Sequence, residues 1–375
     1  MKYYIIAGEA SGDLHGSNLI KGLLAEDPQA EIRFWGGSLM AEAGGEMVHD
    51  YRDGAVMGLT DVLAKAGKLL GNLRRCKKDI LNWKPDAVIL IDYPGFNMKI
   101  ARFAHEKGLK VFYYIAPKTW ASRESRNRKL REYVDRLFIV FPFEIPYFTE
   151  KQIPFTYKGN PLIDAVDSAT YTRQQEGRYI AILPGSRKGE ISRMMPVCME
   201  VADRLHALPE YSDFNFIVAG APARSDADYS AHMCGRDYVK LVYGQTYSIL
   251  KWAEAAIINS GTASLEAALI KTPQVVCWST SPLTAFVARN IFKVMNHIKY
   301  ISLGNLIVDR LAFKELIQED FTADKVTEEV RRLIEDRVYR SKMMSNYHDI
   351  RNSLGGSGAS RSVARAMIVE LEKQN

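Results

Sequence analysis

The sequence has few of the residues that build disulfide frameworks and metal sites. Its 375 residues include four cysteines, which lie far apart without a C-x-x-C pair, and seven scattered histidines without an H-E-x-x-H pattern. This spacing argues against a zinc site and against a disulfide framework. A P-loop and a G-x-S-x-G motif are also missing. Metal, ATP and serine-hydrolase chemistries therefore lack support, and the cysteine usage is typical of a reducing cytoplasm.

Long apolar runs are missing too. A membrane-spanning helix needs roughly 18 apolar residues, and the best run here, 137–148, is interrupted by Pro142, Glu144 and Pro146. The first apolar run, 3–7, is shorter than the core of a signal peptide. We therefore expect a cytoplasmic protein without a transmembrane segment.

Positive charge exceeds negative charge only mildly. The formal net charge of +6 suits an anionic substrate or an acidic lipid surface, and no nucleic-acid-binding signature accompanies it. An apolar fraction of 47% and a charged fraction of 25% are typical of globular domains, and the length suits two of them.

Strand-like runs alternate with helical patterns in two series, which predicts an α/β fold with parallel sheets. The runs of the first series are 3–8, 31–37, 86–92, 110–117 and 136–144, and those of the second are 179–187, 214–222, 239–244, 255–262 and 272–280. We expect two Rossmann-like domains, 1–163 and 164–345, facing each other across a cleft. A helical tail, 346–375, is expected to return to the first domain or to swap onto a partner in a homodimer.

Two turns of the second series suit a phosphate. Gly185, Ser186 and Arg187 follow a strand and precede a helix, so free helix amides and a guanidinium could cradle a diphosphate. The alternative is an ordinary turn with solvated charges. Further on, a strand ends in small residues and a helix with an early carboxylate follows, which could hold a ribose. These residues are Ser260, Gly261, Thr262 and Glu266; the alternative is a buried helix with Glu266 in a capping box.

The strand ends of the first series carry charged residues instead. Asp92 closes a buried strand, where a general base belongs, although it could equally cap the following turn. Glu9 and Asp13 give the opening turn the wrong charge for a phosphate. Lys118 and Arg123 follow another strand and could hold an anionic acceptor, unless they simply belong to a solvated helix face.

Residues 56–78 form a basic amphipathic pattern. An ordinary helix packed on a core has almost the same pattern and is the commoner case, but the density of cations keeps a membrane-surface or acyl-chain role open. The apolar residues concerned are Val56, Met57, Leu59, Val62, Leu63, Leu69, Leu70 and Leu73.

Seven segments in this order resemble the lipid-A-disaccharide synthase family. They are AGEASGD at 7–13, VMGLTDVL at 56–63, IDYPGFN at 91–97, YYIAPKTWA at 113–121, LPGSRKGEI at 183–191, SGTASLEAAL at 260–269 and YISLGNLI at 300–307. Any one of them would fit several sugar-nucleotide enzymes, whereas their joint occurrence along the whole chain is specific.

The resemblance implies an inverting, metal-independent glycosyltransferase of the two-Rossmann GT-B architecture that needs no cofactor. Such an enzyme joins UDP-2,3-diacylglucosamine to 2,3-diacylglucosamine 1-phosphate and forms the β-1,6-linked disaccharide 1-phosphate and UDP. It works at the inner leaflet of the cytoplasmic membrane as a peripheral protein, with UDP on the C-terminal domain and the acceptor on the N-terminal domain.

The resemblance also suggests a role for each site residue. The base is Asp92, or else Glu9 or Asp13, and Asn97 positions Asp92. Gly95 departs from the motif, in which an acidic residue is common at this place. Acceptor-side candidates are Ser11, Asp13, Lys118 and Arg123, and donor-side candidates are Gly185, Ser186, Arg187, Ser260, Gly261, Thr262, Glu266 and Asn305.

Other interpretations remain open at this point. An enzyme that uses UDP-N-acetylglucosamine, either an epimerase or a murein-type transferase, would share the architecture and the kind of donor. A non-catalytic peripheral lipid-binding protein with a vestigial nucleotide fold is the alternative outside enzymes.

Overall fold

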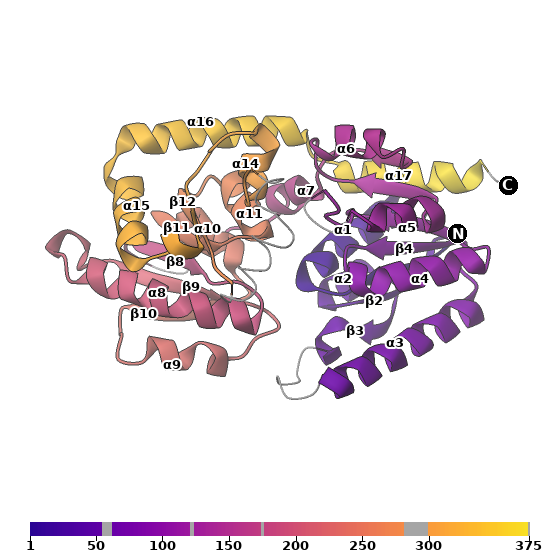
Figure 1. The fold of residues 1–375 in the computed structure, drawn as a ribbon, viewed down its shortest axis with the longest axis horizontal. Coiled ribbons are helices and arrows are strands. Elements are labelled where there is room, and N and C mark those ends of the chain that lie inside the picture. The colour runs from indigo at the N-terminus through magenta and orange to yellow at the C-terminus, as the bar shows by residue number, and fades with distance from the viewer. Residues whose placement is uncertain (55–61, 121–123, 174–175, 281–298, 374–375) are drawn as a thin grey trace. The chain divides into compact units, whose positions relative to one another are not determined.

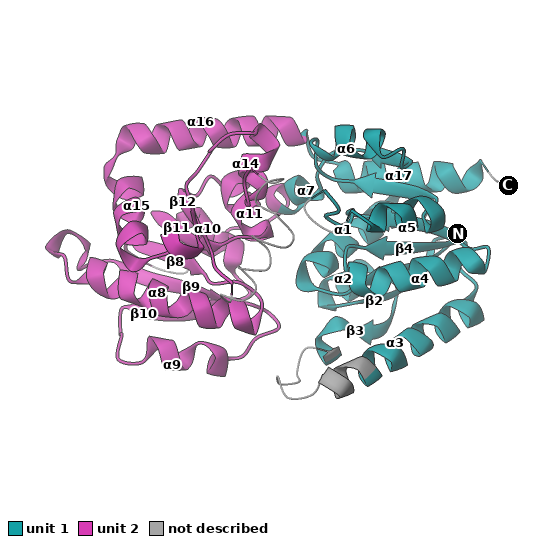
Figure 2. Cartoon of the chain, viewed as in Figure 1, with its two compact units in different colours: residues 1–165, 355–375 teal, residues 166–354 magenta. Residues whose placement is uncertain are grey.

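The computed structural model describes residues 1–54, 62–120, 124–173, 176–280 and 299–373. The chain divides into two compact units, which Figures 1 and 2 show. Unit 1 is Met1–Ala165 with Gly355–Asn375, and unit 2 is Val166–Leu354. Each unit has its own parallel sheet with helices around it, so the predicted α/β class with two Rossmann-like sheets is confirmed.

The sheet of unit 1 has seven strands in the order β3-β2-β1-β4-β5-β6-β7, all of them parallel. The strands are β1 (Lys2–Ala7), β2 (Glu31–Gly36), β3 (Glu46–Asp50), β4 (Ala87–Ile91), β5 (Lys110–Tyr114), β6 (Arg136–Ile139) and β7 (Phe155–Tyr157). The helices between them are α1 (Ala10–Glu26), α2 (Ser38–Ala43), α3 (Val62–Trp83), α4 (Pro94–Glu106), α5 (Arg126–Tyr133) and α6 (Glu144–Glu150), and α7 (Pro161–Asp167) follows β7 and ends in unit 2.

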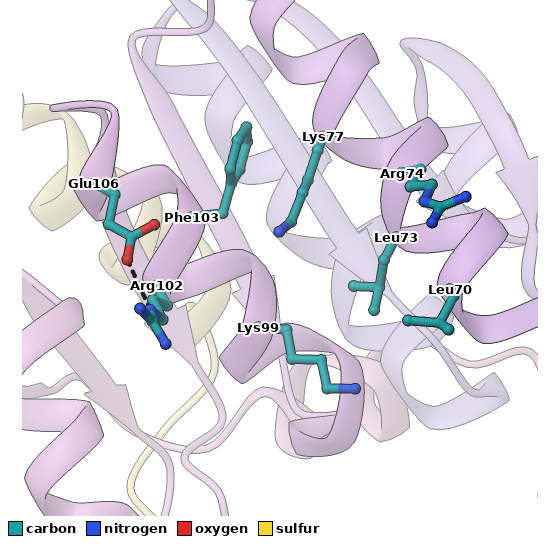
Figure 3. A pocket seen from close by; sticks show the side chains of 8 residues that line it. All are labelled: Leu70, Leu73, Arg74, Lys77, Lys99, Arg102, Phe103 and Glu106. Carbon is teal, nitrogen blue, oxygen red and sulfur yellow. Dashed lines mark hydrogen bonds and ion pairs between the residues drawn. The ribbon is translucent and has the colours of Figure 1, made fainter. Parts of the chain in front are cut away.

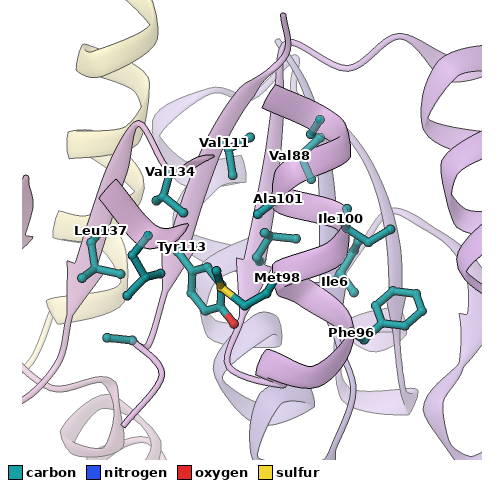
Figure 4. Close-up of a cluster of buried hydrophobic side chains, with 14 of the residues drawn as sticks. Ile6, Val88, Phe96, Met98, Ile100, Ala101, Val111, Tyr113, Val134 and Leu137 are labelled. Atoms are coloured by element: carbon teal, nitrogen blue, oxygen red, sulfur yellow. The ribbon is translucent and has the colours of Figure 1, made fainter. Parts of the chain in front are cut away.

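Central strands of unit 1 are apolar on both faces because helices cover both sides of the sheet. All five residues of β4 are buried. Figure 4 shows part of the core, where Ile100 and Ala101 of α4 gather with Val88 of β4 and Val111 of β5. This packing fixes the strand ends from which the loops of the first candidate site project.

The sheet of unit 2 has six parallel strands in the order β10-β9-β8-β11-β12-β13. The strands are β8 (Tyr179–Leu183), β9 (Asn215–Gly220), β10 (Val239–Tyr243), β11 (Ala255–Asn259), β12 (Gln274–Trp278) and β13 (Glu315–Ile317). The helices are α8 (Lys188–His206), α9 (Ser230–Met233), α10 (Thr246–Trp252), α11 (Thr262–Ile270), α14 (Leu303–Val308), α15 (Ala323–Glu335) and α16 (Arg337–Leu354).

The last helix, α17 (Ala359–Glu372), packs along α1, so the chain after α16 belongs to unit 1. Gly22 permits a close approach, because a Cβ there would lie 3.0 Å from the Arg361 Cα. Glu26 pairs with Arg365 at 2.8 Å and also with Arg361. The tail is therefore held to unit 1 by close packing and by ion pairs.

Three short strands, β3, β7 and β13, were not anticipated. They have three to five residues each and lie at the sheet edges, where a strand has a neighbouring strand on one side only. Among the helices that the structure describes, none is both long enough and apolar enough to cross a membrane.

Candidate functional site

The turn that joins β4 to α4 is the most strained backbone near the predicted base. Asp92 and Tyr93 have φ angles of 42° and 47°, so two successive non-glycine residues are left-handed. Each such residue costs roughly 1–3 kcal/mol, and strain of this kind persists where the surroundings enforce it. Here the Asp92 carbonyl accepts hydrogen bonds from Tyr113 Oη at 2.6 Å and from Asn97 Nδ2 at 2.8 Å.

Asn97 is buried and serves this turn from below. Its Nδ2 also lies 3.1 Å from the carbonyl oxygen of Ile91 and 3.4 Å from that of Ile6. Asn97 thus ties the ends of β1 and β4 together and contacts the backbone of Asp92 rather than being exposed to a ligand. It is a positioning residue for the Asp92 turn.

The glycine of the opening turn makes room for a side chain. A Cβ on Gly8 would lie 2.3 Å from Cδ1 of Tyr93, so the loop after β1 and the turn after β4 are in contact. Tyr93 also stacks on Phe96 with ring centroids 5.7 Å apart. Close approach of the backbone here is therefore explained by packing and needs no phosphate.

The three polar residues of the opening turn have different surroundings. Asp13 is 2% exposed, and its carboxylate accepts hydrogen bonds from the amides of Gly37 (2.8 Å), Met40 (3.1 Å) and Leu39 (3.2 Å). It holds the start of α2, and burial raises its pKa. Ser11 is half-buried in the first turn of α1.

Glu9 is the carboxylate that the opening turn presents at the surface. It is exposed at the N-cap position of α1. Burial and the charge of Glu9 raise the pKa of Tyr93. Of the acids in the opening turn, Glu9 is therefore the one that remains accessible beside the Asp92 turn.

The loop after β5 is strained as well. Ile115 has a φ of 62°, which is an outlier for a β-branched residue, and its neighbour Tyr114 accepts the Asp92 amide hydrogen at 3.2 Å. The strained positions on β4 and β5 are thus adjacent at one sheet edge. Lys118 of this loop is exposed, and Arg123 lies outside the residues that the structure describes.

A buried acid that the sequence did not point out anchors the next segment. Glu144 is 1% exposed, and its carboxylate accepts hydrogen bonds from the amides of Val140 (3.2 Å) and Phe141 (3.1 Å) and from Trp120 Nε1 (3.2 Å). Burial raises the pKa of Glu144 to about 7. Glu144 therefore connects the loop that carries Lys118 to the end of β6.

Arg126 was also overlooked among the many cations of its segment. It begins α5, and its charge acts on the Tyr113 hydroxyl. Burial raises the pKa of Tyr113, the charge of Asp92 raises it further, and the charge of Arg126 lowers it. The charges of Asp92 and Arg126 therefore both act on the hydroxyl of Tyr113. The sequence signal that could have pointed to Arg126 is the strand order, because the segment with Arg126 follows β5, and β5 is the neighbour of β4.

In unit 2, the loop after β8 meets the end of β11. Gly185 has a φ of +108°, and a Cβ there would lie 2.6 Å from Glu190 Oε2 and 2.9 Å from Asn259 Nδ2. β8 and β11 are neighbouring parallel strands, so their loops share one carboxyl edge, as the sequence predicted. Only glycine fits this position without strain.

Two backbone amides just before α8 are already engaged by a side chain of the helix itself. The amides of Ser186 and Arg187 donate to Glu190 Oε2 at 3.0 and 3.2 Å, and Arg187 Nη1 lies 3.2 Å from Glu190 Oε1. The physical reason is a capping box, in which a carboxylate three residues along reaches back to the helix start. The Glu190 carboxylate thus occupies the position at the Ser186 and Arg187 amides that a phosphate could take.

Arg193 stands close to the same loop and was missed because it falls on a helix face. Its Nε donates to the Ser279 carbonyl at 3.0 Å, just beyond β12. A Cβ on Gly189 would lie 3.3 Å from Arg193 Nη1. A second guanidinium therefore lies between the start of α8 and the end of β12.

The small residues after β11 begin a helix without a side-chain cap. Gly261 is the N-cap residue, α11 begins at Thr262, and Ser260 Oγ donates to the Ile301 carbonyl at 3.4 Å. Glu266 is half-buried and accepts a hydrogen bond from Tyr247 Oη at 2.9 Å, so it is not part of a capping box. Burial raises the pKa of Glu266.

Asn305 is enclosed by its own unit. It is buried, its Nδ2 donates to Phe313 O at 3.0 Å and Glu315 Oε1 at 2.8 Å, and its Oδ1 accepts the Ala312 amide at 2.8 Å. The Glu315 carboxylate also accepts the Ile301 and Ser302 amides, each at 3.0 Å. Asn305 therefore acts on the 300–307 segment through this network, which spacing alone did not reveal.

The predicted lipid-contacting residues divide into four groups. Val56, Met57 and Leu59 lie outside the residues that the structure describes, and Val62 and Leu63 begin α3. Leu73 is buried in the core and Leu69 packs against it. Leu70 is 52% exposed. Of those whose side chains the structure describes, Leu70 alone presents most of its apolar surface to the solvent.

Comparison with known proteins places the chain. Residues 3–368 match the family model described as lipid-A-disaccharide synthetase. The lipid-A-disaccharide synthase of Geobacter metallireducens is 37% identical, with 99% of this chain and 97% of that protein covered. The protein of the same name from Myxococcus xanthus is 34% identical, with 97% and 96% covered.

Solved structures with this fold include other enzymes. A putative UDP-N-acetylglucosamine 2-epimerase from Listeria monocytogenes gives a TM-score of 0.70 at 13% identity, covering 100% of this chain and 97% of that one. The MnaA–UDP structure from S. aureus gives 0.69 at 15%, covering 99% and 97%. Such low identities show the fold alone, so the full-length family match decides between the epimerase and the transferase. The chain therefore belongs to the lipid-A-disaccharide synthase family.

Proposed function

We propose that this protein joins UDP-2,3-diacylglucosamine to 2,3-diacylglucosamine 1-phosphate and releases UDP. The observation that carries the proposal is Asp92, whose strained turn at the end of β4 is held by Asn97 and Tyr113. A carboxylate carried by a fixed backbone turn at a strand end is suited to take a proton from an acceptor hydroxyl. The family match supplies the kind of substrate.

The donor belongs to unit 2 in this proposal. Arg187, Ser186 and the start of α8 take the diphosphate, and Arg193 adds a second cation from the same helix. The diphosphate displaces the Glu190 carboxylate from the amides, because both are anions that suit a helix start. Glu266 holds the ribose hydroxyls, and Ser260, Gly261 and Thr262 let the ligand approach the backbone.

The acceptor belongs to unit 1, with Glu9, Ser11, Arg126 and Lys118 as its ligands. Asp13 and Asn97 act by shaping this site, since the Asp13 carboxylate and the Asn97 Nδ2 are engaged with the backbone. The support for this assignment is their common place at the carboxyl edge of the sheet, where open α/β sheets bind ligands.

The reaction is a single displacement in this proposal. The acceptor 6-hydroxyl attacks the anomeric carbon, its proton passes to Asp92, and the bond from that carbon to the β-phosphate oxygen breaks. UDP leaves with the bonding electron pair, and the charge that grows on it is stabilised by Arg187, Arg193 and helix amides without a metal. Attack from the face opposite UDP inverts the anomeric configuration.

We further propose a peripheral place on the inner face of the cytoplasmic membrane. The support is the exposed Leu70 on a helix rich in lysine and arginine, together with the acyl chains of both substrates. The tail packs on α1, and a C-terminal swap in a homodimer would make the same contact with the α1 helix of a partner. Light scattering separates the two arrangements, because a closed tail gives a mass of about 42 kDa per particle and a swapped homodimer gives twice that mass.

The test is an assay with both substrates. Incubation with UDP-2,3-diacylglucosamine and the monosaccharide phosphate should give equal amounts of UDP and disaccharide phosphate. Release of free diacylglucosamine would indicate a hydrolase instead. Conversion of UDP-N-acetylglucosamine at its second carbon would indicate an epimerase, and binding without turnover would indicate a non-catalytic lipid-binding protein.

A further inference from the structure

Two helices of unit 1 enclose a surface hollow whose lining residues all differ from those of the candidate site at the carboxyl ends of the strands. Its volume is about 440 Å³, and it lies between α3 and α4 (Figure 3). It is lined by Leu70, Leu73, Arg74, Lys77, Lys99, Arg102, Phe103 and Glu106. Nothing in the proposed transfer reaction uses these side chains.

The rim of the hollow carries four cations and one carboxylate. Glu106 is taken by Arg102, whose Nε lies 2.7 Å from its Oε1. Within the described ranges, no carboxylate pairs with Arg74, Lys77 or Lys99, and Lys77 Nζ lies 4.9 Å from the centre of the Phe103 ring. Cations gathered from two helices repel one another, and a bound anion relieves that repulsion.

The floor of the hollow is apolar. Leu73 is 6% exposed, Phe103 is half-buried, and Leu70 is 52% exposed at one end. A small inorganic anion gains nothing from contact with an apolar side chain such as Leu70. Cations around an apolar floor instead match a molecule with an anionic head and a hydrocarbon part.

We propose that the hollow between α3 and α4 binds the headgroup of an anionic phospholipid in the membrane surface. The proposal rests on the peripheral membrane association proposed above and names its attachment point. The phosphate contacts Arg74, Lys77 and Lys99, and the glycerol and upper acyl carbons lie along Leu70 and Phe103. α3 is also the helix whose beginning carries the predicted lipid-contacting residues, so both features belong to one surface element.

The experiment measures binding of the full chain to vesicles by sedimentation. Vesicles contain phosphatidylcholine with about a third phosphatidylglycerol, or phosphatidylcholine alone. The double substitution Arg74→Gln with Lys99→Gln should weaken binding to the anionic vesicles about thirtyfold, because each basic residue at such a surface contributes about 1 kcal/mol. Both side chains are exposed, so the fold should be retained.

A matched control removes the same charge outside the hollow. Lys78 and Lys107 are exposed near the same two helices and do not line the hollow. Lys78→Gln with Lys107→Gln should weaken binding less than threefold. Equal losses in both double variants would show diffuse attraction and overturn the proposal, as would no loss in either variant.

A soluble anion gives the third arm. Inorganic phosphate at 150 mM ionic strength should not bind the wild type saturably in calorimetry; saturable binding that the double variant lost would reassign the hollow to soluble anions. Transfer is assayed separately with detergent-dispersed substrates. If the wild type and the double variant turn over equally in this assay while the double variant loses vesicle binding, the headgroup site is supported. If no variant turns over, the proposed reaction is contradicted and the headgroup site is not affected.

Discussion

The carboxyl edges of the two sheets differ in chemistry although the sheets share one architecture. The edge in unit 1 has non-glycine residues in left-handed conformations at 92, 93 and 115, and acids held at fixed places. The edge in unit 2 has Gly185 and Gly261, two guanidinium groups and two helix starts. An acid on a strained, braced turn suits proton transfer, and glycine with cations suits a diphosphate. The same fold thus provides two kinds of site through its loops alone.

The largest expected effect comes from the acid at the unit 1 edge. Asp92→Asn should lower turnover about 10³-fold, since a positioned base contributes about 10²–10⁴-fold. UDP affinity should change less than twofold, because UDP is assigned to unit 2. Steady-state kinetics and calorimetry measure the two quantities. Asp86→Asn, which alters an exposed acid just before β4, is the control and should leave turnover unchanged. Turnover retained by Asp92→Asn would show that Asp92 is not the base, and the contrast between a proton-transfer edge in unit 1 and a diphosphate edge in unit 2 would fail.

The next effect tests the cations of unit 2. Arg187→Ala should weaken UDP binding about 10–100-fold, because a charged hydrogen bond to a phosphate is lost. Binding of the monosaccharide phosphate should not change. Calorimetry of each ligand gives the answer, with Arg204→Ala on the same helix as the control, since Arg204 pairs with Glu200 and Asp324 instead. Weaker acceptor binding with unchanged UDP binding would reverse the assignment of the two edges.

A third test concerns stability at the unit 1 edge. Because the folded chain raises the pKa of Glu144 to about 7, it keeps a proton that the unfolded chain releases near pH 4.5. The stabilisation is full below about pH 4.5 and is lost as the pH rises through about 7. Between pH 5 and 8, the free energy of unfolding should fall by about 2 kcal/mol more in the wild type than in Glu144→Gln.

Calorimetric unfolding across this pH range measures the difference. Glu42→Gln, at an exposed acid of the same unit, is the control and should follow the wild type. Parallel profiles for the wild type and Glu144→Gln would show that Glu144 does not titrate in this range, and the edge would then lack its buried protonated acid.

The smallest effect sharpens the donor side. Tyr247→Phe removes the hydroxyl that donates to Glu266 at 2.9 Å and should weaken UDP binding about fivefold. Loss of this donor raises the pKa of Glu266 further, so the defect should grow as the pH falls. UDP titrations between pH 5 and 8 measure it. Tyr238→Phe, from the similar pair with Asp203, is the control, and an equal defect in both would contradict a ribose role for Glu266.

Much of the molecule could be predicted from its sequence. Runs such as β4 are apolar on both faces, which indicates a buried parallel strand. Parallel strands place their carboxyl ends at one edge, so the motifs after β8 and β11 had to come together. Edge strands such as β3 were missed because short half-exposed segments carry little apolar pattern.

The uses of individual polar groups could not be predicted. Asp13 and Glu9 look alike in the opening turn, yet the amides that engage Asp13 come from residues 37–40. Asn305 appeared available to a donor, but Glu315 and the 312–313 segment bind it. Such partners depend on contacts across the chain, and sequence spacing does not report them.

The sequence by itself determined the family, the two parallel sheets and the order of the loops at their edges. Those features follow from local apolar patterns and short motifs, which are continuous along the chain. Only the tertiary structure decided that Asp13 is an internal brace while Glu9 is exposed, that Glu190 occupies the amides before Lys188, and that cations of α3 and α4 converge on one hollow. The physical reason is that a hydrogen bond or a charge cluster requires atoms within a few ångströms, and folding brings those atoms together from distant positions in the chain.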